Sequence, residues 1–563
     1  MSLMWTDDDV RPGTPRRTKT VFVLLLAALP VYFLLLGANS IWDANEAFYV
    51  DTPRQMVLTG DYVTPVFNGQ ERLNKPVLSY WVVAGLYRMF GISVTVERVG
   101  IAMGAVGIIL AAFLVGRALR STVVGLLAAV IVATSPRMVM FSRRIFIDIY
   151  VTLFMALALA CFVLARRFPE HRRLCLTAMY GAIGLGVLTK GPVALFFPVV
   201  AFAIWLIVER RWSEVRHLMI VPGAIIVTAI VAPWYVALYL THGWGPIVQF
   251  LVGENLGRYT GEMASEGRGV LFYLPVLLGD LFPWSPLVIV PLLSAWRPAV
   301  GEEDVAHASI RRLLWIWIVA ITVVFSLSES KQDLYIFPVV PAVAALVADA
   351  LVWSRFGRDD WRIAGLVALV ALLTAVLGAA SWWLFGRGYY RLDGVWLVGI
   401  ACIAGGLATL ALLVAGRHRN AVLTLATTFV AFNYVFVSLV LPSTERLKPA
   451  MPMADVIRAR AADTGHIGAY HMMFPSIVYY VGRPIEELAD PAQVEAFFAR
   501  ESDRGSWVIM GEDRYDRLRS TIPGLCVVDR RPLFEAKLSD LISQRPPADV
   551  LLVGNRCSDE PSR

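Results

Sequence analysis

The first hydrophobic run of the chain, VFVLLLAALPVYFLLLGA (Val21–Ala38), is followed at once by the polar segment NSIWDANEAFYVDTPRQM (Asn39–Met56). A run of roughly 18 to 20 apolar residues is long enough to cross a bilayer. Ionisable groups beside a span are costly to keep there and usually serve a function. The junction of these two segments therefore predicts a membrane protein whose functional site begins just outside its first span.

The composition supports this interpretation. The chain has 563 residues, of which 57% are hydrophobic and 17% charged, and its mean hydropathy is +0.62. Soluble proteins carry about 25% charged residues. We attribute the net charge of +7 to arginines in cytoplasmic loops, not to nucleic-acid binding. The sequence contains neither a P-loop nor an inverted repeat of the transporter kind.

Apolar runs of spanning length predict a polytopic α-helical protein with about thirteen spans. The runs lie near residues 20–38, 97–116, 122–140, 147–165, 174–190, 191–208, 217–240, 271–295, 311–328, 334–353, 361–385, 394–415 and 421–441.

Arginine clusters orient these spans by the positive-inside rule. A basic cluster at residues 11–19 precedes the first span, so we expect a cytoplasmic N-terminus. The apolar segment 76–90 is short, and counting it as a span would invert every later cluster. We therefore expect it to be an interfacial or re-entrant helix on the outer face. The segment 39–96 and everything after Pro442 are then extracytoplasmic.

The predicted organisation has three parts: a cytoplasmic tail (1–19), a membrane domain (20–441) and an extracytoplasmic α/β domain (442–563). The first outer loop (39–96) is expected to hold helices at Glu46–Thr59 and Pro76–Phe90, and residues 241–270 form a second outer loop.

In the last domain, strand-like and helix-like patterns alternate. The strand-like runs are HIGAYH, SIVYYVG, SWVIMG, LCVVDRR and DVLLVG; the helix-like runs are PMADVIRARAAD and PAQVEAFFARES. Cys526 and Cys557 also lie here. They would be able to pair outside the cytoplasm, and the sequence leaves both the bonded and the free state open.

The first outer loop carries candidate catalytic carboxylates, Asp43 and Glu46. A carboxylate at a membrane boundary can act as general base toward an acceptor hydroxyl. On the expected helix, Tyr49 shares a face with Glu46, and Arg54 lies toward the next face. The alternative is a helix cap by Asp43 or Asn45.

Three lysines lie at the outer ends of predicted spans or loops: Lys75 in NKP, Lys190 in LTKGP and Lys331 in SESKQD. Lysine binds phosphate as a point charge, and a lipid-linked phosphate is the anion most available at this depth. The alternative is that each lysine anchors its span by snorkelling.

Asp148 begins a span beside Arg143 and Arg144, and these arginines lie on the outer side, against the positive-inside trend. They indicate an anionic ligand, with tolerated snorkelling as the alternative. Asp148 either pairs with them or orients the catalytic site. Tyr335 has the position of an interfacial aromatic residue.

These motifs, in this order, resemble the family 39-like group of the GT-C superfamily. Its members are membrane glycosyltransferases that use polyprenyl-phosphate sugars, and they include the lipid A aminoarabinose transferase and the protein O-mannosyltransferases. The resemblance rests on WDANEAFY, NKP, RRIFIDIYVTLFMALAL, LTKGPVALFFP, ENLGRY…FYLPVLLGDLFPWSPL and FSLSESKQDLYIFPVVPAVA, and it covers most of residues 20–350.

The chain departs from the family pattern in two places. The family's acidic Asp-Glu pair is Asn45-Glu46 here, so the resemblance assigns the base to Glu46 or Asp43. The aminoarabinose transferases have Glu-Lys-Pro where this chain has Asn74-Lys75-Pro76, and the second outer loop lacks their histidine. These changes argue against aminoarabinose transfer to lipid A specifically, and they remove likely metal ligands.

The resemblance implies transfer of a sugar from a polyprenyl-phosphate donor to a lipid, glycan or protein hydroxyl on the outer face of the bacterial cytoplasmic membrane, with inversion and without a metal. The implied catalytic residues are Glu46, Asp43 and Asp148. The implied donor-binding residues are Lys75, Lys190, Lys331, Arg143, Arg144, Tyr49, Arg54, Arg258 and Tyr335. A transporter or a non-catalytic sensor of lipid-linked sugars is the alternative. The donor sugar and the acceptor remain open.

Overall fold

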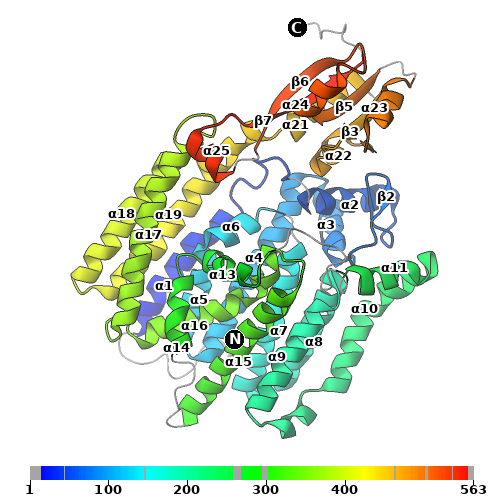
Figure 1. Ribbon diagram of the computed structural model, residues 1–563. Helices are drawn as coiled ribbons and strands as arrows, with labels where there is room; N and C mark the ends of the chain where they lie inside the picture. The colour runs from blue at the N-terminus through cyan, green and yellow to red at the C-terminus, as the bar shows by residue number, and fades with distance from the viewer. Residues whose placement is uncertain are drawn as a thin grey trace.

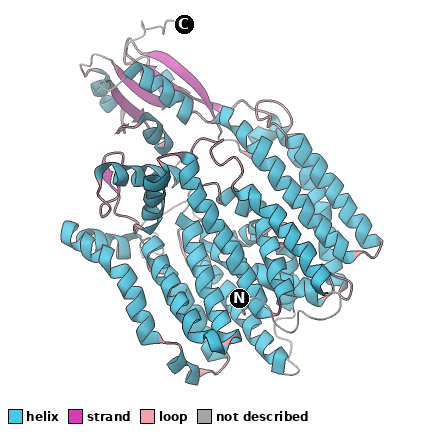
Figure 2. Cartoon of the chain, turned by 180° about the vertical axis from the view of Figure 1, so that it is seen from behind, coloured by secondary structure: helices cyan, strands magenta, loops and turns pink. Residues whose placement is uncertain are grey.

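The computed structural model describes residues 14–42, 45–144, 147–254, 257, 268–293, 302–461, 465–500, 505–534 and 537–555. Long helices form one bundle, and a small sheet domain lies at one end of it, beside α2 (Asn45–Thr59) and α3 (Leu78–Phe90) (Figure 1). Seen from behind, the strands are confined to this domain and to one short hairpin in the first outer loop (Figure 2).

Eight helices of the described chain are long and apolar enough to cross a membrane, or nine if one bent pair is a single span. The protein is therefore a multi-pass membrane protein. The single helices are α4 (Val94–Leu119), α7 (Ile147–Arg167), α10 (Ile220–His242), α15 (Glu302–Leu327), α17 (Trp361–Phe385) and α18 (Val395–Val414). Two further spans join consecutive elements: η9 (Asp333–Val339) with α16 (Val340–Trp353), and α19 (His418–Val435) with η10 (Phe436–Val440), α20 (Leu441–Ser443) and η11 (Thr444–Leu447).

The other five predicted spans coincide with helices that are shorter, broken or less apolar, so the number thirteen is not confirmed. These helices are α1 (Thr14–Ala28) with η3 (Leu29–Tyr32), α5 (Thr122–Thr134) with α6 (Pro136–Phe141), α8 (Arg172–Lys190), α9 (Val193–Val208), and the pair α13 (Tyr273–Asp280) and α14 (Ile289–Leu293). Segments that include α13 and α14 meet at 113°. Proline, which removes a backbone donor, stands at the start of η3 and α6.

The centre of the bundle is packed through small residues. A Cβ added at Gly125 of α5 would lie 2.6 Å from the carbonyl oxygen of Phe113 in α4. One added at Gly116 of α4 would lie 3.0 Å from the Cα of Gly125. Glycines allow two membrane helices to approach backbone to backbone. The pair α4 and α5 is therefore held by close contact of main chains.

The segment 39–96 folds as predicted at its two helices, α2 (Asn45–Thr59) and α3 (Leu78–Phe90). At 1.5 Å per residue α3 is about 20 Å long, too short to span a bilayer. Between them lies a hairpin that was not predicted, made of β1 (Val66–Phe67) and β2 (Gln70–Glu71). Asn68 and Gly69 form its turn with φ of 52° and 75°, as Asn-Gly turns do.

The C-terminal domain has a five-stranded sheet in the order β4-β3-β5-β7-β6. β3 pairs in parallel with β4 and β5, whereas β7 runs antiparallel to β5 and β6. Its strands are β3 (His466–Tyr470), β4 (Glu486–Leu488), β5 (Ser506–Gly511), β6 (Cys526–Leu533) and β7 (Ala548–Gly554); its helices are α21 (Ala450–Ala461), α22 (Pro475–Val481), α23 (Pro491–Phe498), α24 (Glu512–Leu518) and α25 (Leu538–Ser543).

One predicted strand of this domain is wrong, because the run SIVYYVG is helix α22. Pro475 occupies its first turn, where proline favours a helix start, and Gly482 ends it with φ of 83°. The other four strand-like runs and both helix-like runs are confirmed. Cys526 is disulfide-bonded, and Cys557 lies outside the described residues.

Candidate functional site

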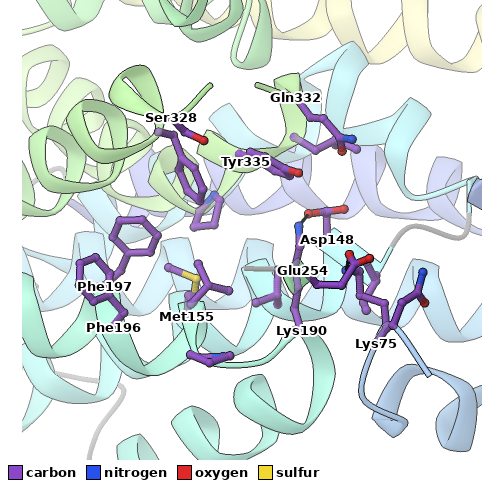
Figure 3. A pocket seen from close by; sticks show the side chains of 18 of the residues that line it. Lys75, Asp148, Met155, Lys190, Phe196, Phe197, Glu254, Ser328, Gln332 and Tyr335 are labelled. Carbon is purple, nitrogen blue, oxygen red and sulfur yellow. Dashed lines mark hydrogen bonds and ion pairs between the residues drawn. The ribbon is translucent and has the colours of Figure 1, made fainter. Parts of the chain in front are cut away.

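A cavity of about 570 Å³ lies where residues of the segment 39–96 and of η6 (Gln249–Glu254) meet the ends of the long helices. Figure 3 shows charged side chains gathered at one end of it and Phe196, Phe197 and Met155 at the other. The lining residues are Tyr49, Arg72, Asn74, Lys75, Ile147, Asp148, Val151, Met155, Lys190, Pro192, Val193, Phe196, Phe197, Leu251, Glu254, Val324, Phe325, Ser328, Gln332, Leu334, Tyr335 and Pro338.

Two lysine–carboxylate pairs form the charged end (Figure 3). The Nζ of Lys75, from the loop after β2, lies 3.1 Å from a carboxylate oxygen of Glu254. Glu254 is the last residue of η6 (Gln249–Glu254), in the second outer loop. Lys190, at the end of α8, pairs with Asp148 in the first turn of α7. The cavity therefore offers ammonium groups whose present partners are carboxylates.

Aromatic residues support these cations. The Nζ of Lys190 lies 4.7 Å from the ring centroid of Tyr335, close enough for a cation–π contact. Tyr49 stacks on Tyr80 with 5.2 Å between ring centroids. Burial raises the pKa of Tyr49 well above its ordinary value.

Arg72 also lines the cavity, and the sequence prediction missed it. Its guanidinium carbon lies 3.7 Å from the ring centroid of Phe48 in α2. The sequence feature that could have identified Arg72 is its place in ERLNKP, three residues before Lys75. With Arg72, the described lining holds three cationic and two anionic side chains.

The apolar end of the cavity continues along the membrane helices. Val324 of α15 lines both the cavity and a second, apolar groove of about 430 Å³. This groove lies between α9 and α15, and its lining includes Val200, Ile204 and Val208 at four-residue spacing. Such spacing places the three side chains on one helix face. An apolar path therefore leads from the charged end down the side of the bundle.

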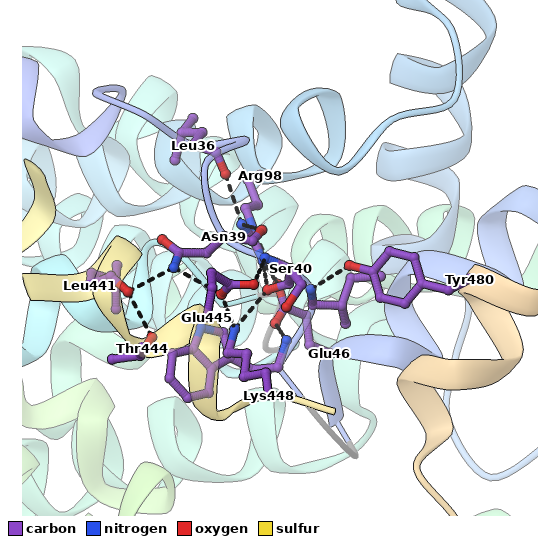
Figure 4. A network of polar contacts seen from close by, with 12 residues as sticks. Leu36, Asn39, Ser40, Glu46, Arg98, Leu441, Thr444, Glu445, Lys448 and Tyr480 are labelled. Atoms are coloured by element: carbon purple, nitrogen blue, oxygen red, sulfur yellow. Dashed lines mark hydrogen bonds and ion pairs between the residues drawn. The ribbon is translucent and has the colours of Figure 1, made fainter. Parts of the chain in front are cut away.

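Glu46 lies outside this cavity, in a buried network (Figure 4). Its side chain is 1% exposed, and one carboxylate oxygen accepts hydrogen bonds from Arg98 Nε at 3.0 Å and Nη2 at 2.7 Å. The other oxygen accepts the Trp42 amide. Arg98 also donates to the carbonyls of Leu36, Asn39 and Ser40. This geometry holds Glu46 as an anchor for the end of the first span.

The same network reaches the C-terminal side of the chain (Figure 4). Glu445 accepts from Asn39 and from the Ser40 amide, each at 3.0 Å. Lys448 donates to the Ser40 carbonyl at 3.0 Å and lies 2.9 Å from Glu445. The hydroxyl of Tyr480 in α22 accepts the Ile41 amide at 2.7 Å. The first outer loop and the C-terminal domain are thus tied through buried polar contacts.

Four other predicted site residues do not line the cavity. Lys331 is 5% exposed and donates to the Ser328 carbonyl at 2.6 Å. Arg54 pairs with Asp51 and donates to the Tyr479 carbonyl at 2.8 Å. Arg143 donates to the carbonyls of Val31 and Leu34, and Arg144 lies 4.4 Å from the Trp42 ring centroid.

Of the two alternatives for Asp148, pairing with the neighbouring arginines is not what the structure shows, because Asp148 pairs with Lys190 from another helix. Asp43 and Arg258 lie outside the described residues. Of the predicted residues, the structure brings Tyr49, Lys75, Asp148, Lys190 and Tyr335 together in one cavity. Within the described chain, no three histidine, cysteine or carboxylate side chains gather as metal ligands.

The chain is similar in sequence to a protein family and to several known proteins. A family described as dolichyl-phosphate-mannose-protein mannosyltransferase matches residues 18–243. An uncharacterized protein of Aquifex aeolicus (strain VF5) is 26% identical over 85% of this chain and 91% of its own length. The undecaprenyl phosphate-alpha-4-amino-4-deoxy-L-arabinose arabinosyl transferase of Pseudomonas aeruginosa (strain LESB58) is 30% identical over 65% of this chain and 66% of its own length. The match thus spans just under two thirds of that transferase.

Solved structures share the fold. ArnT from Cupriavidus metallidurans, bound to undecaprenyl phosphate, has a TM-score of 0.78 and 21% identity, covering 97% of this chain and 100% of its own. The Archaeoglobus fulgidus oligosaccharyltransferase in its apo form has a TM-score of 0.51 and 13% identity, covering 88% of this chain and 69% of its own.

Proposed function

We propose that this chain, which resembles the polyprenyl-phosphate-sugar-dependent glycosyltransferases of the GT-C superfamily in sequence and in fold, is itself such a transferase. It moves a sugar from a polyprenyl-phosphate donor to a hydroxyl of a lipid, glycan or protein. The observation that carries the proposal is the two-ended cavity. Lys75, Lys190 and Arg72 face a phosphate at one end, and the apolar groove beside α9 and α15 accommodates a prenyl chain at the other.

The cations give the cavity its chemical role. When the bond between the anomeric carbon and phosphate oxygen breaks, negative charge accumulates on the departing lipid phosphate. Preorganised ammonium and guanidinium groups in a site screened from water stabilise that charge. Asp148 holds Lys190 in place for this purpose. The proposed reaction inverts the anomeric centre and uses these side chains, without a metal, to neutralise the phosphate.

The proposed orientation puts the N-terminus in the cytoplasm and the cavity and C-terminal domain outside it, at the bacterial inner membrane. The basic cluster before the first span supports the cytoplasmic N-terminus. The disulfide at Cys526 supports an oxidising surrounding for the C-terminal domain, since disulfides persist outside the cytoplasm.

The direct test uses purified protein in lipid nanodiscs, supplied with undecaprenyl-phosphate sugars and an envelope extract of the host. Mass spectrometry follows the new glycoconjugate and the released undecaprenyl phosphate. We expect both to appear together. A donor that is bound but never consumed would contradict the proposal and favour a sensor or transporter of lipid-linked sugars.

Substitution of the two cavity lysines tests the site. Lys75→Met and Lys190→Met should each weaken undecaprenyl-phosphate binding about tenfold to a hundredfold, because a hydrogen bond to a charged group contributes ~1.5–3 kcal/mol. Native mass spectrometry of the lipid complex measures the change. Lys537→Met, which changes an exposed lysine of the C-terminal domain, is the matched control. Wild-type affinity in both cavity variants would place the phosphate elsewhere.

A further inference from the structure

The resembled family has an Asp-Glu pair where this chain has Asn45-Glu46, and an amide cannot take a proton from a hydroxyl at neutral pH. Glu46 is held by Arg98 outside the cavity. The carboxylates that line the cavity in the described chain are Asp148 and Glu254.

These two carboxylates differ in their settings. Asp148 stands in the first turn of α7, a helix of the packed bundle, and its partner Lys190 also contacts Tyr335. Glu254 ends η6, outside the long helices of the bundle, and lines the cavity together with Leu251. The role of a base toward the acceptor therefore suits Glu254, and that of a group that positions Lys190 suits Asp148.

We propose that Glu254 is the general base of the transfer reaction and that Lys75 holds it until the donor arrives. The proposal rests on the function proposed above. In the unliganded cavity, the Lys75 ammonium lies 3.1 Å from the Glu254 carboxylate. The donor's phosphate competes for the same ammonium group. Once Lys75 binds the phosphate, Glu254 can turn to the acceptor hydroxyl.

The step balances in bonds and protons. The Glu254 carboxylate takes the proton of the acceptor hydroxyl as the acceptor oxygen bonds to the anomeric carbon. The bond from that carbon to the phosphate oxygen breaks, and its electron pair stays on the phosphate. The products are the glycosylated acceptor, polyprenyl phosphate and protonated Glu254, which returns its proton to water.

Charge also balances through the step. The charged side chains described in the cavity lining, Arg72, Lys75, Lys190, Asp148 and Glu254, sum to one positive charge. A sugar phosphodiester carries one negative charge and neutralises them. The released phosphate monoester carries about two negative charges near neutral pH. Protonation of Glu254 removes one negative charge from the side chains as the phosphate gains one, so the site stays complementary to its ligand.

The test is Glu254→Gln in nanodiscs with undecaprenyl-phosphate sugars as donor. General base catalysis contributes typically 10²–10⁴-fold, so the transfer rate at saturating donor should fall by about that factor. Binding of undecaprenyl phosphate should be unchanged or tighter, because its competitor for Lys75 has lost its charge. Glu71→Gln, at a 57% exposed glutamate of the first outer loop, is the control and should keep wild-type activity.

Two further readouts separate a base from a structural residue. The wild-type rate should fall at acid pH as the carboxylate is protonated, and this dependence should be absent in Glu254→Gln. Glu254→Asp, which keeps a carboxylate, should retain the pH dependence with a rate between those of the other two.

Each contrary outcome is distinct. Wild-type turnover in Glu254→Gln would overturn the assignment of Glu254 and leave the transferase function standing. Joint loss of lipid binding and activity would make Glu254 a binding or folding residue and overturn it equally. A wild-type protein that consumes no donor would instead contradict the proposed function itself.

Discussion

Arg98 donates hydrogen bonds to one carboxylate and three backbone carbonyls, and no sequence motif predicted this role. Its guanidinium joins the Glu46 carboxylate to three carbonyls at the end of the first span, and it is 2% exposed. Removing one partner of a buried ion pair leaves the other charge without compensation. Breaking the Arg98–Glu46 pair therefore lowers the free energy of unfolding by more than the intact pair contributes to it.

Arg98→Met should lower the free energy of unfolding by about 3–5 kcal/mol, because Glu46 and the three carbonyls lose their donor. Thermal unfolding in detergent measures the loss. Arg88→Met, at an exposed arginine of α3, is the control. Adding Glu46→Gln to Arg98→Met should recover part of the loss. An unchanged melting temperature in Arg98→Met would show that the network contributes no stability.

The contact partners of single residues could not be predicted from the sequence. The family motif predicted a catalytic role for Glu46. Arg98, which holds Glu46 outside the cavity, lies 52 positions away in the sequence. Glu254 pairs with Lys75 across 179 positions, and no local pattern encodes that meeting. Lysines followed by helix-breaking residues, in contrast, were recognisable individually, and Lys75 and Lys190 do line one cavity.

Elements were predictable where the sequence pattern is local and sustained. The long apolar helices follow from the length of their apolar runs, and most strands of the C-terminal domain follow from short apolar runs between turn residues. A short apolar run alone is ambiguous, because a seven-residue stretch fits a strand or a buried helix equally. The run that forms α22 is of this kind. The five predicted spans that are shorter or broken show that longer apolar runs do not define the length of a helix either.

The contact between α4 and α5 depends on glycine. Gly125→Leu should destabilise the bundle by about 1–3 kcal/mol or more, because its side chain meets the α4 backbone at 2.6 Å and neither helix can move without disturbing the core. Gly181→Leu in α8 is the matched control, since no atom lies within 4 Å of a Cβ there. Equal melting temperatures for the two variants would contradict the close packing.

At the scale of the whole molecule, the hairpin turn of the first outer loop docks the C-terminal domain. Asn68 donates to the Ile485 carbonyl at 2.9 Å and accepts the Ile485 amide at 2.7 Å. Together with the contacts of Ser40 and Ile41, these bonds place the C-terminal domain over the loop that supplies Arg72 and Lys75. The position of that domain and the shape of the cavity are thus coupled through one short segment.

Asn68→Gly should loosen this docking while preserving the left-handed turn, at a cost of about 0.5–1.5 kcal/mol for each hydrogen bond lost. Hydrogen exchange should then accelerate around Ile485 and leave β5 and β7 protected. Asn555→Ala removes a similar pair of bonds inside the domain, to Ser506 and Phe498, and should have the opposite pattern. Identical exchange maps for the two variants would refute the docking role.

Under the proposed function, the groove between α9 and α15 has a consequence for how the protein meets a lipid-linked donor. Its lining includes Ile204, Val208, Val319 and Val323, which are between 38% and 53% exposed on the outside of the bundle. A donor that enters by this route diffuses in two dimensions within the bilayer. Occupancy of the cavity is then set by the mole fraction of donor among the lipids and not by its concentration in the surrounding water. Under the proposed function, the rate then changes with the fraction of carrier lipid that is loaded with sugar, at a constant amount of enzyme.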